Sequence, residues 1–159
     1  MKNQFVYTFE QFASLDELGE HDLHLLQMAQ QASRLAYAPY SRFRVGAVAR
    51  LVNGETLNGT NLENASFPAG ICAERVLLSA LSAIHPKEPI DTIAISYSGD
   101  DVESDHYIAP CGICRQSLVE YEQRLQHPIR LILGGLTGPV IVIDSVSFLL
   151  PLAFTNSSL

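Results

Sequence analysis

The 159-residue sequence is short of basic residues and lacks a long apolar run. Its 10 lysines and arginines are outnumbered by 17 aspartates and glutamates, and the formal net charge is −7. Because nucleic-acid binding draws most of its affinity from cationic side chains on phosphates, we expect no nucleic-acid partner. No apolar run approaches the roughly 20 residues that a membrane-spanning helix needs, so we expect no membrane partner. We interpret the acidic excess as an aid to solubility.

The first residues, MKNQFVYTFEQF, lack the apolar stretch of a secretory signal, and from this we expect a cytoplasmic protein. The length suits one domain with a full hydrophobic core. We therefore expect an N-terminal extension over residues 1–20 and a single domain over residues 21–159.

Cysteine is also scarce, with three in the chain, and an odd number cannot pair completely within it. Two of them, Cys111 and Cys114, form a C-x-x-C motif. In a reducing compartment such a motif more often binds metal or carries out redox chemistry than forms a structural disulfide.

Hydrophobic periodicity and turn residues predict alternating helices and strands. A β-hairpin is expected around the Asn53–Gly54 turn. The acidic segment 99–110 is expected to be a solvated surface loop. The predicted helices cover residues 21–37, 72–85 and 111–125; the predicted strands cover 44–52, 55–61, 91–98, 129–135 and 140–146; a short turn or helix covers 147–154. This order predicts an α/β fold, with three α/β/α layers and a mixed five-stranded sheet.

The three cysteines fall at the starts of two predicted helices. The partial positive charge of a helix N-terminus favours the thiolate, which is the form that binds metal. Cys111 and Cys114 lie on one face of a helical turn, and the fold must bring Cys72 to them. Three thiolates without a fourth cysteine are typical of a catalytic zinc site, which keeps one position for water. Glu74, two residues after Cys72, can lie close enough to take a proton from that water.

Two charged residues in this region have simpler interpretations. Glu74 alone would be an ordinary first-turn glutamate, but its combination with the cysteine motifs favours chemistry. Arg75 lies one turn after Cys72 and could hydrogen-bond the sulfurs, which makes it a candidate for supporting the metal ligands. An ordinary surface position on the helix is an equally good interpretation of Arg75.

Several motifs in register resemble the small homotetrameric zinc-dependent cytidine deaminases. They are AYAPYSRFRVGA (36–47), GTNLENASF (59–67), CAER (72–75), PCGICRQ (110–116) and LLPLAF (149–154). Together they cover roughly residues 22–155 in the order of that family and match the three-cysteine form of the zinc-deaminase signature. The resemblance implies the cytidine deaminase fold for residues 21–159 and one zinc ion per chain. It also implies hydrolytic deamination of cytidine and 2′-deoxycytidine in pyrimidine salvage, by a homotetramer with shared active sites.

The same resemblance implies a role for each matched residue. Cys72, Cys111 and Cys114 would hold zinc, and Glu74 would move protons between water, the ring nitrogen N3 and the departing ammonia. The remaining roles concern the substrate: the Ala73 backbone N–H would bind the 2-carbonyl, Asn61 and Glu63 the sugar hydroxyls, and Phe43 the base, while Phe154 would reach the ring from a neighbouring subunit. Without the resemblance, Phe43 and Phe154 would be core residues, and Asn61 and Glu63 turn residues.

Two positions depart from the family pattern. Phe67 stands where many members have tyrosine, which removes a hydroxyl near the sugar's 5′ end, and Ala109 stands where serine is common. Two other functions remain open. The substrate could be a modified nucleoside or a nucleoside-like antibiotic such as blasticidin S. Alternatively, the cysteines could form a structural zinc site with a histidine as fourth ligand.

Overall fold

A mixed six-stranded sheet organises the protein, and the computed structural model describes residues 1–155 of the chain. The strands and α-helices of these residues follow one another as β1 (Glu10–Phe12), α1 (Glu20–Ser33), β2 (Phe43–Leu51), β3 (Thr56–Thr60), α2 (Ala73–Ile84), β4 (Ile90–Gly99), α3 (Gly112–Leu125), β5 (Arg130–Gly134) and β6 (Val140–Ile143). Short 3-10 helices cover Leu15–Glu17, Phe67–Ala69 and Val146–Leu149. The predicted α/β class is confirmed.

The predicted number of five strands is wrong, because β1 adds a sixth at the edge of the sheet. It pairs antiparallel with β6, with Glu10 opposite Val142 and Phe12 opposite Val140. A strand of three residues is too short to show a hydrophobic alternation in the sequence. Part of the predicted extension over residues 1–20 therefore belongs to the sheet.

The strand order is β1-β6-β5-β4-β2-β3. Only β4 and β5 are parallel among these described pairs, and α3 supplies the crossover that a parallel pair requires. The predicted hairpin is present as β2 and β3, which pair antiparallel. Gly54 in its turn has a φ of 88°, a conformation that favours glycine.

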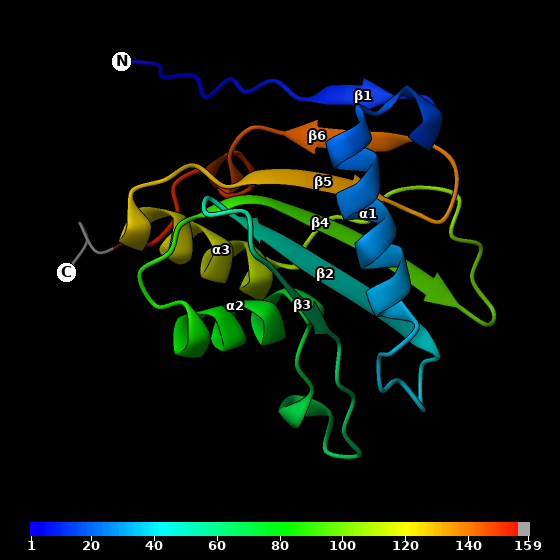
Figure 1. The fold of residues 1–159 in the computed structure, drawn as a ribbon. Helices are drawn as coiled ribbons and strands as arrows, with labels where there is room; N and C mark the ends of the chain where they lie inside the picture. Colours follow the sequence, from blue (N-terminus) through cyan, green and yellow to red (C-terminus); the bar gives the residue numbers. More distant parts are fainter. Residues whose placement is uncertain (156–159) are drawn as a thin grey trace.

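Helices cover both faces of the sheet, with α1 on one face and α2 and α3 on the other (Figure 1). Successive side chains of β4 point alternately into the hydrophobic cores on the two faces of the sheet. Ile93 and Ile95 pack in the core beneath α2 and α3, whereas Ala94 packs in the core beneath α1. Gly46 on β2 permits the close approach of α1, since a Cβ atom there would collide with the Ala29 carbonyl oxygen.

Helix α1 is shorter than predicted, because it ends at Ser33 rather than near Tyr37. Tyr37 instead pairs with the chain that follows β3. Its carbonyl oxygen accepts a hydrogen bond from the Glu63 N–H at 2.9 Å, and it forms a bridge with Leu62. This tertiary pairing draws the chain away from the helix and towards the end of β3.

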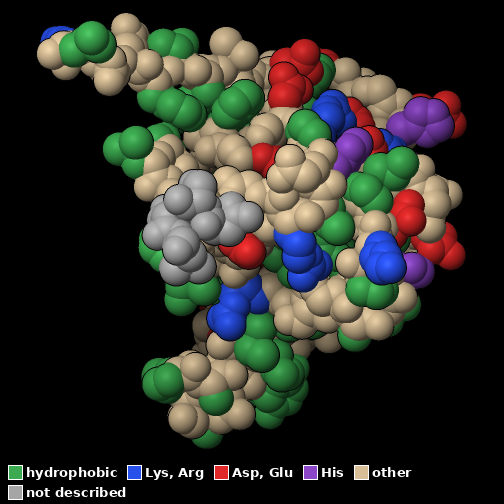
Figure 2. All heavy atoms as spheres, turned by 90° about the vertical axis from the view of Figure 1, so that its left-hand side faces the viewer, with side chains coloured by type: hydrophobic (Ala, Val, Ile, Leu, Met, Phe, Trp, Pro, Cys, Tyr) green, Lys and Arg blue, Asp and Glu red, His purple; other side chains and the backbone are tan. Residues whose placement is uncertain are grey.

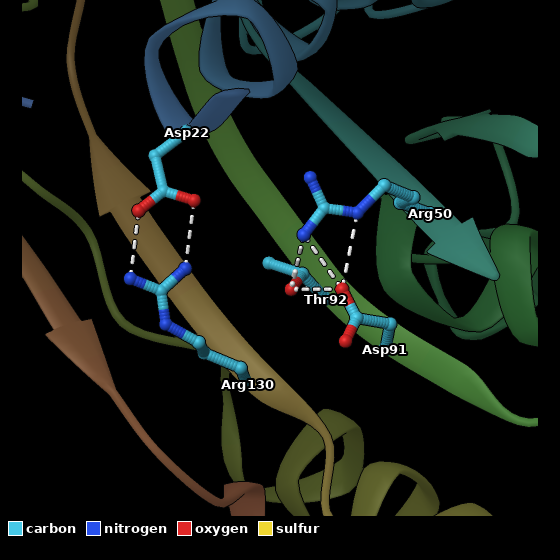
Figure 3. Close-up of polar contacts among 5 residues, drawn as sticks. All are labelled: Asp22, Arg50, Asp91, Thr92 and Arg130. Atoms are coloured by element: carbon cyan, nitrogen blue, oxygen red, sulfur yellow. Dashed lines mark hydrogen bonds and ion pairs between the residues drawn. The ribbon is translucent and has the colours of Figure 1, made fainter. Parts of the chain in front are cut away.

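Two ion pairs brace the sheet away from the cysteines (Figure 3). Arg50 on β2 binds Asp91 on β4 at 2.6 Å, and Asp91 also accepts a hydrogen bond from Thr92. Asp22 on α1 binds Arg130 on β5 through two contacts of 2.7 Å. The first pair connects the ends of β2 and β4 that lie farthest from Phe43.

The chain before β1 forms an arm that leads away from the sheet (Figure 1). Figure 2 shows hydrophobic side chains at its upper left, whereas charged side chains lie mainly at the centre and right of that view. Tyr7 in this arm stacks on Phe148, with ring centroids 6.1 Å apart. Within residues 1–155, no helix is long and apolar enough to cross a membrane.

Candidate active site and metal centre

The three cysteines lie together where α2 and α3 begin. Cys72 and Cys111 are the N-cap residues of the two helices, and Cys114 lies in the first turn of α3. The three sulfur atoms lie within 4.8 Å of one another. Cys72 Sγ is 3.9 Å from Cys111 Sγ, which is 3.3 Å from Cys114 Sγ. The fold thus brings together the residues that the sequence analysis assigned to one metal site.

The cysteine cluster fits a zinc ion. Two sulfurs bound tetrahedrally to zinc at about 2.3 Å lie roughly 3.8 Å apart, a separation similar to those observed here. In the described part of the chain, the cluster contains these three cysteines and no histidine. The structure therefore gives no support to a structural site with histidine as fourth ligand. Three protein ligands leave a position for water, as in catalytic zinc sites.

Close backbone packing places Cys72. Gly59 on β3 lies against the first turn of α2, where an added Cβ atom would be 2.5 Å from the Ala73 carbonyl oxygen. The Cys72 carbonyl oxygen accepts hydrogen bonds from the Arg75 and Val76 N–H groups, each at 3.1 Å. The start of α2 is therefore fixed against the sheet, with the Cys72 side chain at its tip.

Glu74 is buried beside the cysteines, with 5% of its surface exposed. Burial raises the pKa of its carboxyl group above the usual range, although its own backbone N–H and the Cys114 thiol act in the opposite direction. A carboxylate with a raised pKa is suited to accept and return a proton near neutral pH. Its position beside the cysteine cluster is the one that the proton-transfer role requires.

The three thiols differ in acidity. Burial raises the pKa of Cys72 and of Cys114, and the neighbouring Glu74 carboxylate adds to both effects. In Cys111, hydrogen bonds from Cys114 and Cys72 outweigh the effect of burial, and the pKa is lowered.

The two arginines near the cysteines occupy different places. Within residues 1–155, no hydrogen bond joins the Arg75 guanidinium to a sulfur; its side chain lines a groove between α2 and α3 with Ser79 and Tyr121. Arg115 instead donates to the Pro110 carbonyl at 2.8 Å and to the Leu149 carbonyl at 3.2 Å. Arg115 thus connects the segment before Cys111 with the C-terminal segment, a contact that the sequence did not predict.

A hollow of about 280 Å³ lies beside the cysteine cluster. This volume is near the lower end of the roughly 300–1,000 Å³ typical of small-molecule sites. The residues that line it are Tyr40, Asn61, Leu62, Glu63, Asn64, Phe67, Gly70, Ile71 and Cys72. Two of the predicted sugar-binding residues and one predicted zinc ligand therefore share one hollow.

Asn61 and Glu63 are both held by backbone contacts. The Asn61 side chain accepts from the Val45 N–H at 2.7 Å and donates to the Phe43 carbonyl at 2.9 Å. The Glu63 carboxylate accepts from the Tyr40 N–H at 2.8 Å and from the Ser41 N–H and hydroxyl. The hydrogen bond from the Ser41 hydroxyl lowers the Glu63 pKa despite the opposing effect of burial. The Ser41 N–H contacts both carboxylate oxygens, so each oxygen of Glu63 has two contacts in this structure.

Three other predicted residues, Ala73, Phe43 and Phe154, do not line this hollow. Ala73 is fully buried as the first residue of α2, where backbone N–H groups lack partners within the helix. Phe43 begins β2, and its ring stacks on Tyr97. Phe154 is 61% exposed, and its carbonyl accepts from Gln116 at 2.8 Å. Phe67 is 76% exposed, and its ring forms a T-shaped pair with that of Tyr40, with centroids 6.1 Å apart.

The four acidic residues of the acidic loop (residues 99–108) are exposed, as predicted for a solvated surface loop. The loop is also anchored to the protein through Ser104. Ser104 is buried, and its hydroxyl donates to the Tyr97 carbonyl at 2.7 Å. Its own carbonyl accepts from the Leu136 and Thr137 N–H groups. The composition of the loop showed its charge, but not the partners that the β5–β6 connection supplies.

Comparison with known proteins agrees with this geometry. The family model described as "Cytidine and deoxycytidylate deaminase zinc-binding region" matches residues 19–126, a range that contains the three cysteines and Glu74. A cytidine deaminase from Halalkalibacterium halodurans is 39% identical over 131 residues, which are 82% of this chain and 92% of that protein. A cytidine deaminase from Mycobacterium tuberculosis is 36% identical over 105 residues, which are 64% of this chain and 74% of that protein.

Solved structures show the same similarity in three dimensions. The cytidine deaminase from Burkholderia pseudomallei has a TM-score of 0.71 and 37% identity, and the alignment covers 86% of this chain and all of that chain. The enzyme from Mycobacterium tuberculosis has a TM-score of 0.63 and 30% identity, with 84% and 97% covered. The chain belongs to the cytidine and deoxycytidylate deaminase family. It carries that family's zinc-binding region, and the described cysteine cluster lies within it.

Proposed function

We propose that the protein deaminates cytidine and 2′-deoxycytidine by hydrolysis, yielding uridine or 2′-deoxyuridine and ammonia. The observation that carries the proposal is the buried Glu74 carboxylate beside the three-cysteine cluster. The similar proteins named cytidine deaminase, which match over most of the chain, support a pyrimidine nucleoside as substrate.

Glu74 would carry the proton transfers, and the three cysteines would hold zinc. A bound zinc ion supplies a Lewis acid that lowers the pKa of water to about 7. Glu74 would accept one proton from that water and pass it to N3 of the cytosine ring. It would then accept the second proton, from the oxygen that has added to C4, and pass it to the amino group, which leaves as ammonia as the C4–N bond breaks. The burial of Glu74 next to the cysteine cluster supports this sequence, because the same group must both accept and donate.

The other residues would bind and orient the nucleoside. Asn61 and Glu63 would bind the sugar hydroxyls, and their backbone contacts would hold their oxygens in fixed positions. The Ala73 N–H would bind the 2-carbonyl, and Phe43 would pack against the base. The aromatic surface and the polar groups together suit a ligand that has a flat base and a polar sugar.

Further parts of the proposal concern the assembly and its setting. We expect a homotetramer in which Phe154 covers the base in a neighbouring active site, and its exposure supports this. Three further points stay predictions: that Arg75 supports the cysteine ligands, that the enzyme acts in pyrimidine salvage, and that it is cytoplasmic. The limits of the catalytic domain, 21–159, also stay a prediction, and its last four residues lie outside the described chain.

The proposal is tested by following the ultraviolet absorbance of cytidine with zinc-loaded protein. We expect cytidine to be converted to uridine. A chelator that removes zinc should abolish the conversion, and added zinc, but not magnesium, should restore it. Full turnover by protein shown to be free of zinc would contradict the proposal. Conversion of a modified nucleoside in place of cytidine would contradict the substrate but not the class of reaction.

A further inference from the structure

The acidic loop approaches the start of β2, where Phe43 lies. The loop is anchored by close contact with the β5–β6 connection. An added Cβ atom at Gly135 would be 2.5 Å from the Ser104 carbonyl oxygen, and an added Cβ atom at Gly138 would collide with the Asp105 carbonyl oxygen. Gly138 also has a φ of 80°. Glycine at these positions lets the two segments touch, and the loop is held where it can contact β2.

Two aspartates of the acidic loop bind the residues on either side of Phe43. The Arg44 guanidinium makes a two-point contact with Asp100, at 2.6 and 3.2 Å. Arg42 lies 3.6 Å from Asp101. Phe43 itself pairs with Gly99, the last residue of β4 and the first of the loop. The backbone that carries the Phe43 ring is therefore held on both sides by the loop.

The Phe43 ring rests on a second aromatic residue. Its centroid is 5.2 Å from that of Tyr97, and the two ring planes are 24° apart. Tyr97 is fully buried, and its hydroxyl contacts the Glu103 carbonyl at 3.2 Å and the His106 ring. Since the loop fixes the far end of the Tyr97 ring, Tyr97 is a rigid support beneath Phe43.

We propose that Tyr97 and the acidic loop position the Phe43 ring and thereby set the affinity of the site for the pyrimidine base. Tyr97 is thus a positioning residue, which acts through Phe43 and does not touch the substrate. This inference rests on the proposed function, in which Phe43 packs against the base. It predicts effects on KM for cytidine and little effect on kcat, because Glu74 and the cysteines are not altered.

The first test is Tyr97→Leu in zinc-loaded enzyme. We expect KM for cytidine to rise about three- to tenfold, the range that the loss of an aromatic pair implies, with kcat changed less than about twofold. Tyr97→Phe keeps the ring and loses only the hydroxyl contacts, so its KM should rise less. Equal effects of the two substitutions would overturn the role of the stacked ring.

A double-mutant cycle separates positioning from a general effect on folding. In a Phe43→Leu background, Tyr97→Leu should cause no further change in KM, because the ring through which it acts is absent. Independent, multiplicative effects on KM would overturn the inference while leaving the proposed function intact. Absence of cytidine turnover in the zinc-loaded parent enzyme would overturn the proposed function itself.

A surface substitution tests the loop without disturbing the core. Asp100→Asn should raise KM about two- to threefold, a size consistent with the small effects of exposed ion pairs. Asp91→Asn is a matched control, because Arg50–Asp91 joins β2 to β4 at the ends far from the loop and its side chains are exposed to a similar degree as those of Arg44–Asp100. Equal KM values for the two variants would contradict the proposed role of the loop.

Discussion

Two glutamates are buried on neighbouring helices, and their surroundings are opposite in kind. Glu122 on α3 is 9% exposed and accepts hydrogen bonds from the Ile129 N–H and from the Ser145 and Ser147 hydroxyls. Glu74 on α2 is 5% exposed, lies among thiols and has a raised pKa because of its burial. One carboxylate is thus surrounded by donors, and the other is held where its charged form is disfavoured.

The contrast distinguishes a structural carboxylate from a reactive one. A buried charge is costly unless hydrogen bonds compensate for it, and Glu122 meets that condition. Its partners come from the start of β5 and from the chain after β6, so it joins three separate segments. Glu74 instead has the Cys114 thiol of α3 as its side-chain partner. Its environment prepares it to change its protonation state, which is what proton transfer requires.

The largest expected effect follows from Glu74→Gln. The amide cannot accept and return a proton as the carboxylate does, so kcat for cytidine should fall about 10²- to 10⁴-fold. Zinc content should stay at that of the parent enzyme, because the three cysteines remain. The unfolding temperature should be unchanged or higher, since a buried ionisable group has been removed. A lowered unfolding temperature would indicate that Glu74, like Glu122, is structural.

The converse effect is expected from Glu122→Gln. The amide nitrogen would face hydrogen-bond donors, and the free energy of unfolding should fall by about 1–3 kcal/mol. For a chain of this size each kcal/mol corresponds to about 2–4 °C in unfolding temperature, which a thermal melt can measure. Turnover at 25 °C should remain within about twofold of the parent. A specific loss of turnover without a loss of stability would assign Glu122 to the active site instead.

A smaller effect should follow from removing one donor to Glu122. Ser145→Ala removes a hydroxyl that donates to the carboxylate and also accepts from the Ser147 N–H. Its cost should be about 1 kcal/mol in the free energy of unfolding. Ser117→Ala is the control, because that exposed hydroxyl donates only within α3, to the Ile113 carbonyl, and the expected change is within about 0.5 kcal/mol. Denaturant titration of both variants would show whether the difference exists.

The sequence predicts those features that local patterns carry. The helix starts at Cys72 and Cys111 follow from periodicity and spacing, and the Asn53–Gly54 turn from its residue types. The strand β1 escaped prediction because its three residues show no pattern of their own and gain their partner only in the sheet. The anchored loop and the contacts of Glu122 depend on segments distant in sequence, which one chain's pattern does not reveal.

In the candidate site, too, local sequence patterns predict some features, and others depend on contacts between distant segments. Spacing was sufficient to place Cys111 and Cys114 on one helical turn, and Cys72 and Glu74 together at the start of another helix. Only the fold brings Cys72 to the other two cysteines. Spacing was not sufficient to show that Asn61 binds the backbone of β2 or that Tyr97 supports Phe43. Those contacts arise from side chains that meet across the sheet, and only the folded chain places them together.

The most direct test of the account compares the parent enzyme with Glu74→Gln and Glu122→Gln, each loaded with zinc. Zinc content, thermal stability and conversion of cytidine to uridine would be measured on the same preparations. The account predicts that Glu74→Gln binds one zinc per chain, melts at or above the temperature of the parent and turns over about 10²- to 10⁴-fold more slowly. Glu122→Gln should melt earlier and remain active below its melting temperature. Conversion of cytidine by zinc-loaded Glu74→Gln at the rate of the parent would contradict the account.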